Sequence, residues 1–233
     1  MLTVEGLNAH YGRAHILADV ALTVGRGEVL ALLGRNGAGK STTMKSIVGL
    51  VPPTSGSIGF EGVEVAGRPP YEIARLGLGY VPEERRVFTD LTVEENLEVG
   101  RQKPRPGVPD WNPEKLYALF PNLAEMRRRP GGQMSGGEQQ MLTIARTLMG
   151  NPSLVLLDEP SEGLAPKIVE QMAETLKALK AEGLTLILSE QNLHFARLVA
   201  DRATIIEKGS IRFSGTMEEL MADEDSRQAY LSV

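Results

Sequence analysis

A glycine-rich stretch near the start of the chain has the residues and the spacing of a phosphate-binding loop. The segment GRNGAGKST at 34–42 satisfies the pattern G-x-x-x-x-G-K-[ST] and follows the apolar run LALL. In such loops the glycines let backbone N–H groups surround phosphates, the lysine reaches the outer phosphates, and the hydroxyl binds Mg²⁺. The sequence therefore predicts a nucleotide cradle, with the Ser41 hydroxyl on Mg²⁺, made of Gly34, Arg35, Asn36, Gly37, Ala38, Gly39, Lys40, Ser41 and Thr42.

Two adjacent carboxylates end a second apolar run, LVLLDEP at 154–160. Such a run is typical of a buried strand, and ligands of α/β sheets bind where the strands end. Neighbouring strand residues face opposite ways, so the two acids can take different roles. We predict that Asp158 holds Mg²⁺ through water, and that Glu159 orients or deprotonates the water that attacks a γ-phosphate. A strand capped by solvated acids is the alternative, and the phosphate loop in the same chain favours the catalytic interpretation.

The stretch MSGGEQQ at 134–140 places a serine and two glycines directly before an expected helix, QQMLTIARTLM. Ser135, Gly136 and Gly137 thus have the composition of a second phosphate-binding helix start, about a hundred residues after the first. An ordinary helix cap at Ser135, with Glu138 completing a capping box, has the same spacing. The two interpretations are compatible, because a helix cap is also an anion site.

Composition excludes several classes of protein. The 233-residue chain has a net charge of −5 and a pI near 5.4, which argue against binding to nucleic acid through its phosphates. It has no cysteine, so disulfides and thiolate metal sites are excluded. The N-terminal residues lack the pattern of a signal peptide, and no apolar run approaches the ~18–20 residues that span a bilayer. We expect a soluble protein whose membrane role comes through a partner.

Strand and helix patterns alternate at both ends of the chain and flank a mainly helical middle. Strands are expected at 2–7, 20–33 (interrupted at 25–27), 56–62, 154–158 and 184–189, with a hairpin at 203–215. Helices are expected at 42–50, 94–99, 115–123, after 137 and at 167–181. The segment 104–113 holds four prolines and is not expected to form regular structure. This pattern predicts an α/β fold with an α-helical insert at roughly 84–150.

The phosphate loop, SGGEQQ and LLDEP, in this order and spacing, resemble the ATP-binding subunit of an ABC transporter over essentially the whole chain. The resemblance implies that the chain binds ATP with Mg²⁺ and hydrolyses it. It also implies a single ABC ATPase domain with a P-loop NTPase (RecA-like) core, an antiparallel β-subdomain and an inserted α-helical subdomain. The core and the β-subdomain would occupy about 1–83 and 151–233, and the helical subdomain about 84–150.

By the same resemblance, two such subunits dimerise head to tail. Ser135, Gly136 and Gly137 of one subunit would cover the γ-phosphate held by the other, and SEGLAP at 161–166 would contact the opposite subunit. Tyr11 would stack on adenine, although a lone tyrosine in this pattern is otherwise a half-buried strand residue. The implied partners are a second, homologous or identical ATPase subunit, two membrane permease subunits and, indirectly, a substrate-binding protein. The implied location is the cytoplasmic face of the plasma membrane, with no nucleic-acid partner.

A narrower resemblance rests on GYVPEERRVFTDLTVEENL at 79–97, LFPNL, MSGGEQQML and EQN at 190–192. These segments are similar to those of the smaller ATPase subunit for branched-chain amino acid uptake. The ATPases for urea and short-amide uptake are near relatives, and they remain alternative assignments. Most ABC ATPases carry Gln where Glu83 stands, a residue that links Mg²⁺ and the attacking water to the helical subdomain. Most carry His where Gln191 stands, a residue that touches the γ-phosphate. We predict that Gln191 senses and positions the γ-phosphate, with capping of the next helix as the alternative.

The remaining histidines and a run of arginines have simpler interpretations. His194 is expected on a helix surface, His10 and His15 in a loop around Tyr11 without metal partners, and 127–129 on a solvated face. The competing function is a non-transport ABC protein that acts on ribosomes or DNA. Such proteins usually have two cassettes or a long coiled-coil insert, whereas this chain has one cassette and an insert of about 50 residues. The transport ATPase is therefore the preferred hypothesis.

Overall fold

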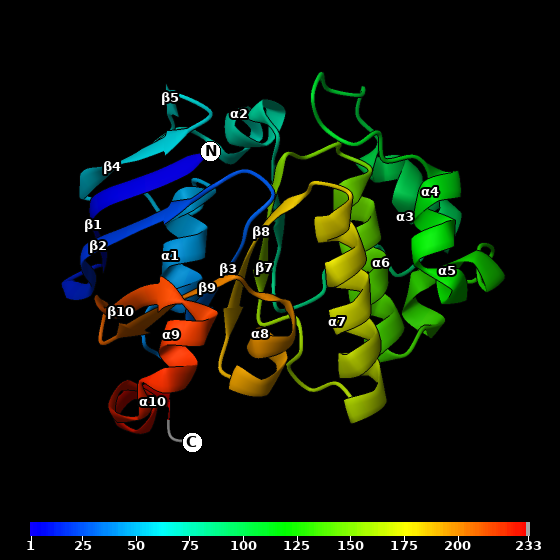
Figure 1. Cartoon of the computed structure of the whole chain (residues 1–233). Helices are drawn as coiled ribbons and strands as arrows, with labels where there is room; N and C mark the ends of the chain where they lie inside the picture. Colours follow the sequence, from blue (N-terminus) through cyan, green and yellow to red (C-terminus); the bar gives the residue numbers. More distant parts are fainter. Residues whose placement is uncertain (232–233) are drawn as a thin grey trace.

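The structure is a computed structural model that describes residues 1–231. In this part of the chain the strands form two sheets. The smaller sheet is antiparallel, has the order β2-β1-β4-β5, and lies at one end of the molecule in Figure 1. Its strands are β1 (Leu2–Tyr11), β2 (Ala14–Val24), β4 (Ser55–Phe60) and β5 (Val63–Glu64).

The larger sheet has the order β10-β9-β3-β8-β7-β6 among the described residues. Its strands are β3 (Val29–Leu33), β6 (Leu78–Val81), β7 (Leu154–Asp158), β8 (Thr185–Glu190), β9 (Arg202–Glu207) and β10 (Ser210–Thr216). All of them are parallel except β10, which pairs with β9 antiparallel. Every residue of β3, β7 and β8 is buried, which explains the nearly uninterrupted apolar runs of β3 and β7 and the apolar centre of β8. The carboxyl ends of the parallel strands meet at one edge of the sheet.

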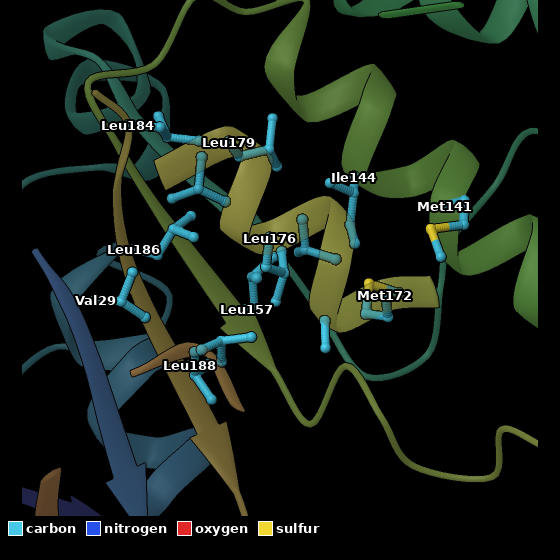
Figure 2. Close-up of a cluster of buried hydrophobic side chains, with 14 of the residues drawn as sticks. Val29, Met141, Ile144, Leu157, Met172, Leu176, Leu179, Leu184, Leu186 and Leu188 are labelled. Carbon is cyan, nitrogen blue, oxygen red and sulfur yellow. The ribbon is translucent and has the colours of Figure 1, made fainter. Parts of the chain in front are cut away.

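Alternating residues of the central strands pack on opposite faces of the larger sheet. Leu30 and Leu32 of β3 face a core shared with β1, β2, β4 and helix α1 (Lys40–Ile47). On the other face, Val29 belongs to a core that includes helices α6 (Gly136–Leu148) and α7 (Pro166–Ala181). Figure 2 shows this second core, with Leu176 and Leu179 of α7 directed at the leucines of β7 and β8. The sheet is therefore held between two apolar layers.

The chain between β6 and β7 consists of helices separated by irregular segments. The helices are α3 (Val93–Gly100), α4 (Pro113–Leu119), α5 (Pro121–Glu125) and α6, with a 3₁₀ turn at Gly131–Gln133. In Figure 1 these helices lie on the side of α7 away from the antiparallel sheet. The other helices are α2 (Pro70–Leu76), α8 (Leu193–Val199), α9 (Met217–Ala222) and α10 (Glu224–Leu231). The division of the chain into subdomains near residues 84 and 150 stays a prediction.

Several sequence-based expectations differ from the structure. The strand expected at 2–7 continues to Tyr11, so His10 and His15 lie in strands rather than in a loop, with their rings stacked 4.2 Å apart. The turn between β1 and β2 is only two residues long, and this lets the pairing continue almost to its tip. The helix expected at 115–123 is split at Pro121, which lacks an N–H group and begins α5. Helices α2, α9 and α10 and strand β6 were missed.

Candidate nucleotide-binding and hydrolysis site

Strand register brings three segments to the same sheet edge. Leu33, the last residue of β3, pairs with Glu190 at the end of β8, and Asp158 at the end of β7 pairs with Ser189. The phosphate loop follows β3, the two carboxylates end β7, and Gln191 follows β8. A parallel sheet binds ligands at this edge. The fold therefore assembles residues that are more than 100 positions apart in the sequence.

The phosphate loop needs glycine at both of its ends. A Cβ atom on Gly34 would lie 2.4 Å from the carbonyl oxygen of Ile206, so the backbone approach leaves no room for a side chain. Gly39 has a left-handed φ of 115° and caps the start of α1, and a Cβ there would lie 2.9 Å from Leu17 Cδ2. Arg35 and Asn36 are exposed and border a cavity of about 360 Å³ next to Gln191.

Lys40 lies inside this loop rather than in solvent. Its side chain is 3% exposed, and the amine donates to the carbonyl oxygens of Gly34 at 2.8 Å and Arg35 at 3.2 Å. The same amine forms an ion pair with Glu159 Oε1 at 3.0 Å. A buried ammonium of this kind needs such oxygen partners to offset its desolvation. The lysine of the loop and the second carboxylate of β7 are thus in direct contact.

Asp158 is surrounded by hydroxyl groups. Oδ1 accepts from Ser41 Oγ at 3.0 Å and from Ser189 Oγ at 2.6 Å, and Oδ2 accepts from the Tyr80 hydroxyl at 2.9 Å. The carboxylate is 1% exposed, so these donors replace its water shell. Mg²⁺ prefers oxygen ligands and is commonly held by one or two protein groups, with phosphates and waters completing its shell. The neighbouring Ser41 and Asp158 oxygens fit such an ion.

Glu159 is held in an uncommon backbone conformation. Its φ is 46°, in the left-handed region, and its N–H donates to the carbonyl oxygen and the hydroxyl of Ser189, each at 3.1 Å. Non-glycine residues adopt this region rarely, and such residues cluster at functional sites. The conformation directs the carboxylate between Lys40 and Gln191, whose Nε2 donates to Oε2 at 2.9 Å.

The pKa of Glu159 reflects opposing effects. Burial acts to raise it, but hydrogen bonds from Glu162, Gln191 and Lys40, together with the charge of Lys40, bring the pKa below its ordinary value. Glu159 is therefore an ionised carboxylate at neutral pH. Glu162 responds in the opposite sense: its hydrogen bond to Glu159, and then burial, raise its pKa to about 7.

Two residues of this region were missed by sequence reasoning. Glu190 is buried at the end of β8, where its carboxylate accepts from the N–H groups of Ser161 at 3.0 Å and Asn192 at 3.3 Å. Burial raises its pKa to about 7. An acid at the end of an apolar strand was the available signal, as it was for Asp158. Tyr80 gave no such signal, because LGYV is too short to show a strand pattern.

Gln191 lies beside Glu159 and does not cap α8, while its role at the γ-phosphate stays a prediction. The residue that caps α8 is Asn192, whose side chain accepts from Phe195 N–H. Gln191 instead hydrogen-bonds Glu159 and borders the cavity beside the phosphate loop. Strands β7 and β8 are neighbours, which is the condition that the prediction required.

We expect Gln191→Ala to lower the ATP hydrolysis rate about tenfold or more, the equivalent of one charge-assisted hydrogen bond of ~1.4 kcal/mol. The variant loses a donor to the Glu159 carboxylate, while the contacts of Lys40 stay intact, so ATP affinity should change little. Gln191→His should stay active and acquire a new pH dependence between about 6 and 7, since imidazole gains a proton there. Steady-state hydrolysis from about pH 5.5 to 8.5 measures both effects.

Asn192→Ala is the matched control, because it removes the helix cap next to Gln191 and leaves the Glu159 contact in place. If Gln191→Ala hydrolyses ATP like the unmodified chain at every pH, Gln191 does not belong to the site.

Ser135 forms a helix cap away from this cluster. Its hydroxyl accepts from Glu138 N–H at 3.4 Å, and its own N–H donates to the Glu138 carboxylate at 2.7 Å, so the expected capping box is present. Gly137 is buried, and a Cβ there would lie 2.8 Å from Ile168 Cγ2 on α7. Within residues 1–231, no hydrogen bond or ion pair joins Ser135 to the phosphate loop. The capping box is thus present and separate from the phosphate loop, while phosphate binding by Ser135, Gly136 and Gly137 stays a prediction.

Tyr11 and Glu83 are both exposed residues. Tyr11 is the last residue of β1, and its side chain is exposed, with 50% of the residue surface accessible. This exposure leaves the ring free to stack on a base, which stays a prediction. Glu83 is exposed in the turn after β6, and its charge contributes to the raised pKa of Glu162. Glu83 therefore lies near the segment that follows the β7 carboxylates.

The fold agrees with comparisons to known proteins. The family model described as ABC transporter matches residues 17–162, and the chain belongs to the ABC transporter family. It is an ATP-binding subunit of that family and an ATPase. Two solved structures are similar over nearly the whole chain. One, an ATP-binding subunit of an ABC transporter, is 31% identical with a TM-score of 0.82, covering 100% of this chain and 96% of that one. The other, an ATP-binding cassette in its ADP conformation, is 26% identical with a TM-score of 0.83, covering 98% and 97%.

Curated relatives are named for branched-chain amino acid transport and for lipopolysaccharide export. The high-affinity branched-chain amino acid transport ATP-binding protein BraG of Pseudomonas aeruginosa is 45% identical over 99% of both chains. The probable branched-chain amino acid transport ATP-binding protein LivF of Archaeoglobus fulgidus is 38% identical, over 96% of this chain and 95% of its own. The lipopolysaccharide export system ATP-binding protein LptB of Haemophilus influenzae is 36% identical, over 99% and 97%.

Proposed function

We propose that this chain hydrolyses ATP at a site shared between two ATPase subunits and uses the cycle to drive membrane permease subunits. The observation that carries the proposal is the meeting of Lys40, Ser41, Asp158, Glu159 and Gln191 at one sheet edge. Lys40 and the backbone of the loop bind the β- and γ-phosphates, and Ser41 and Asp158 hold Mg²⁺. When bound, this ion neutralises charge that develops on the phosphates.

Glu159 is the proposed general base. It is ionised at neutral pH and is already oriented by Gln191, so it can accept a proton from a water aimed at the γ-phosphorus. Its pairing with Lys40 also has a consequence for the order of events. Phosphate oxygens compete for the same amine, so nucleotide binding weakens the pair and frees the carboxylate. Gln191 then donates to the γ-phosphate or holds the attacking water.

The other half of the site comes from the second subunit. Ser135 at the start of α6 retains its O–H as a donor, because its oxygen acts as acceptor in the capping box. The positive end of a 13-residue helix adds to its attraction for phosphate. In a head-to-tail dimer this group covers the γ-phosphate on the opposite phosphate loop, which accounts for the two cradles in one chain.

A groove on the same molecule supports a permease partner. A cavity of about 680 Å³ lies between α2, α3 and α6, and it is bordered by most of the exposed large apolar side chains of the described residues. These side chains are Leu50, Tyr71, Phe88 and Val99. Exposed apolar surface of this kind marks interaction sites. No helix among residues 1–231 is long and apolar enough to cross a membrane, so we infer that the chain joins the cytoplasmic membrane face by docking a permease segment in this groove.

We infer further that the transporter is an importer of branched-chain amino acids, with a substrate-binding protein as the indirect partner. The 45% identity to BraG over the full length supports this substrate class more strongly than the 36% identity to LptB supports export. The segments 79–97 and 190–192, which contain Glu83 and Gln191, also carry the narrower sequence resemblance to branched-chain uptake ATPases. Urea or short amides are the alternative cargo, driven by the same ATPase cycle.

Uptake by intact cells tests this proposal. We expect that deleting the gene from its source organism abolishes high-affinity uptake of radiolabelled leucine, isoleucine and valine, and that the unmodified chain restores it. The matched control is complementation with Glu159→Gln, which should fail at equal expression because the ATPase cycle is blocked. Loss of urea or acetamide uptake with normal leucine uptake would assign the alternative cargo, and no uptake defect with a secretion defect would assign export.

A further inference from the structure

One side chain connects the groove to the proposed metal site. Tyr80 borders the groove, and its hydroxyl donates to Asp158 Oδ2 at 2.9 Å. Strand β6 pairs with β7 so that Tyr80 lies opposite Leu156, two positions before Asp158. Among the groove residues within 1–231, Tyr80 is the one whose side chain hydrogen-bonds a residue of the proposed site.

The hydrogen bond from Tyr80 has a distinct role at the carboxylate. The donors from α1 and β8, Ser41 and Ser189, both bind Oδ1, so Tyr80 alone orients Oδ2 among the described side chains. Burial and the nearby Asp158 charge raise the pKa of Tyr80, so the hydroxyl remains a donor throughout the working range. Groups that hydrogen-bond metal ligands set the ligand orientation and the metal affinity.

Tyr80 lies on an edge strand, between the groove and the carboxylate. Strand β6 is the edge strand of the larger sheet and pairs only with β7 in the described structure. The ring is half-buried, with the groove on one side and the carboxylate at its hydroxyl. A segment that enters the groove therefore contacts a side chain whose far end is bonded to Asp158. This route is separate from Glu83, whose side chain is exposed.

We propose that Tyr80 is a positioning residue that relays the occupancy of the groove to the metal-binding carboxylate Asp158. A partner segment seated against the Tyr80 ring shifts the hydroxyl, reorients Oδ2, and so changes the affinity of the site for Mg²⁺. This inference rests on the proposed roles of the groove and of Asp158. The permease would then control the metal site directly, through one side chain.

The first arm of the test removes the hydroxyl and keeps the ring. We expect Tyr80→Phe to weaken apparent Mg²⁺ affinity by about tenfold, as is typical when a group hydrogen-bonded to a metal ligand is lost. The measurement is calorimetric titration of Mg²⁺ into ATP-saturated protein that also carries Glu159→Gln, so that hydrolysis does not interfere. ATP affinity in EDTA should be unchanged. The matched control is Tyr71→Phe, a groove tyrosine whose hydroxyl, among residues 1–231, bonds only its neighbour Glu72, at 3.3 Å.

The second arm fills the groove. The chain has no cysteine, so Val99→Cys provides a single attachment point at an exposed groove residue. Labelling it with pyrene maleimide should shift apparent Mg²⁺ affinity at least threefold, a modest part of the about tenfold range expected for such contacts. The same label should have no effect when Tyr80→Phe is also present. Glu218→Cys, exposed on α9, is the labelling control.

The outcomes separate the inference from the proposed function. An equal label effect with and without Tyr80→Phe, or no label effect in either background, overturns the relay. Unchanged Mg²⁺ affinity in Tyr80→Phe alone also overturns it. If none of the chains binds ATP, even with Mg²⁺, the proposed nucleotide site itself is wrong.

Discussion

Replacing Glu159 by glutamine is expected to leave ATP binding intact and to slow hydrolysis by about 10²–10⁴-fold, the usual contribution of a general base. The amide keeps the size of the side chain and can still accept from Lys40, but it cannot take a proton from water. Gln191 can accommodate the change by rotating its own amide. In the proposed cycle, hydrolysis releases the closed dimer, so the variant should accumulate as an ATP-bound dimer. Steady-state hydrolysis and size-exclusion chromatography with ATP measure the two effects.

Glu162→Gln is the informative control for this experiment. Glu162 hydrogen-bonds Glu159 and has a pKa raised to about 7, so an amide resembles the neutral form that it already populates. We expect this variant to keep most of its hydrolysis. A Glu159→Gln chain that hydrolyses ATP at the normal rate would exclude Glu159 as the base, and a rate loss confined to Glu162→Gln would transfer that role to Glu162.

Lys40→Ala should weaken ATP affinity about 10- to 100-fold, which corresponds to the loss of one or two hydrogen bonds to charged groups. The ammonium group is buried inside the loop, where few waters can replace it on the phosphates. The substitution also leaves Glu159 without its cationic partner, and an unpaired buried charge destabilises the fold. Calorimetric titration with ATP should therefore be accompanied by thermal unfolding.

The double variant Lys40→Ala with Glu159→Gln separates the loss of phosphate contacts from the effect of the unpaired Glu159 charge, because it removes that charge as well. If both variants lose ATP affinity, the loss comes from the missing contacts between Lys40 and the phosphates. If the double variant recovers affinity, the loss comes from repulsion between the unpaired Glu159 and the phosphates.

Ser135→Arg extends the experiment to the dimer: it should bind ATP and fail to hydrolyse it. Mixing it with Lys40→Ala should restore some hydrolysis, since one composite site then contains an intact loop and an intact Ser135. Full activity of Ser135→Arg alone contradicts the shared site.

Much of the fold and of the site could be predicted from local sequence signals. The buried strands β3 and β7 are nearly continuous apolar runs, β8 has an apolar centre, and each leads into residues that can bind phosphate or metal. The phosphate loop is recognisable because glycine and lysine spacing reflects backbone geometry that few sequences share. The Ser135 capping box could also be predicted, because its two hydrogen bonds join residues only three positions apart in the sequence.

What could not be predicted depends on contacts between distant segments. Tyr80 reaches Asp158, and Glu190 reaches Ser161, because β6, β7 and β8 lie side by side, and no short pattern encodes that order. The extension of β1 to Tyr11 was missed because its pairing with β2 continues through polar residues at the hairpin tip. The left-handed backbone conformation of Glu159 could not be predicted from the sequence either, since it depends on hydrogen bonds to the Ser189 backbone and hydroxyl.

The capping box at Ser135 has a thermodynamic consequence for assembly. Two hydrogen bonds to Glu138 already fix this residue in the single chain, so little conformational entropy remains to be lost when a second subunit arrives. If two subunits share the nucleotide as proposed, contacts with ATP contribute to the association free energy, and by linkage the dimer population rises with the ATP concentration. A cell's energy charge would set how many transporters are poised to turn over, without any regulatory protein reading it.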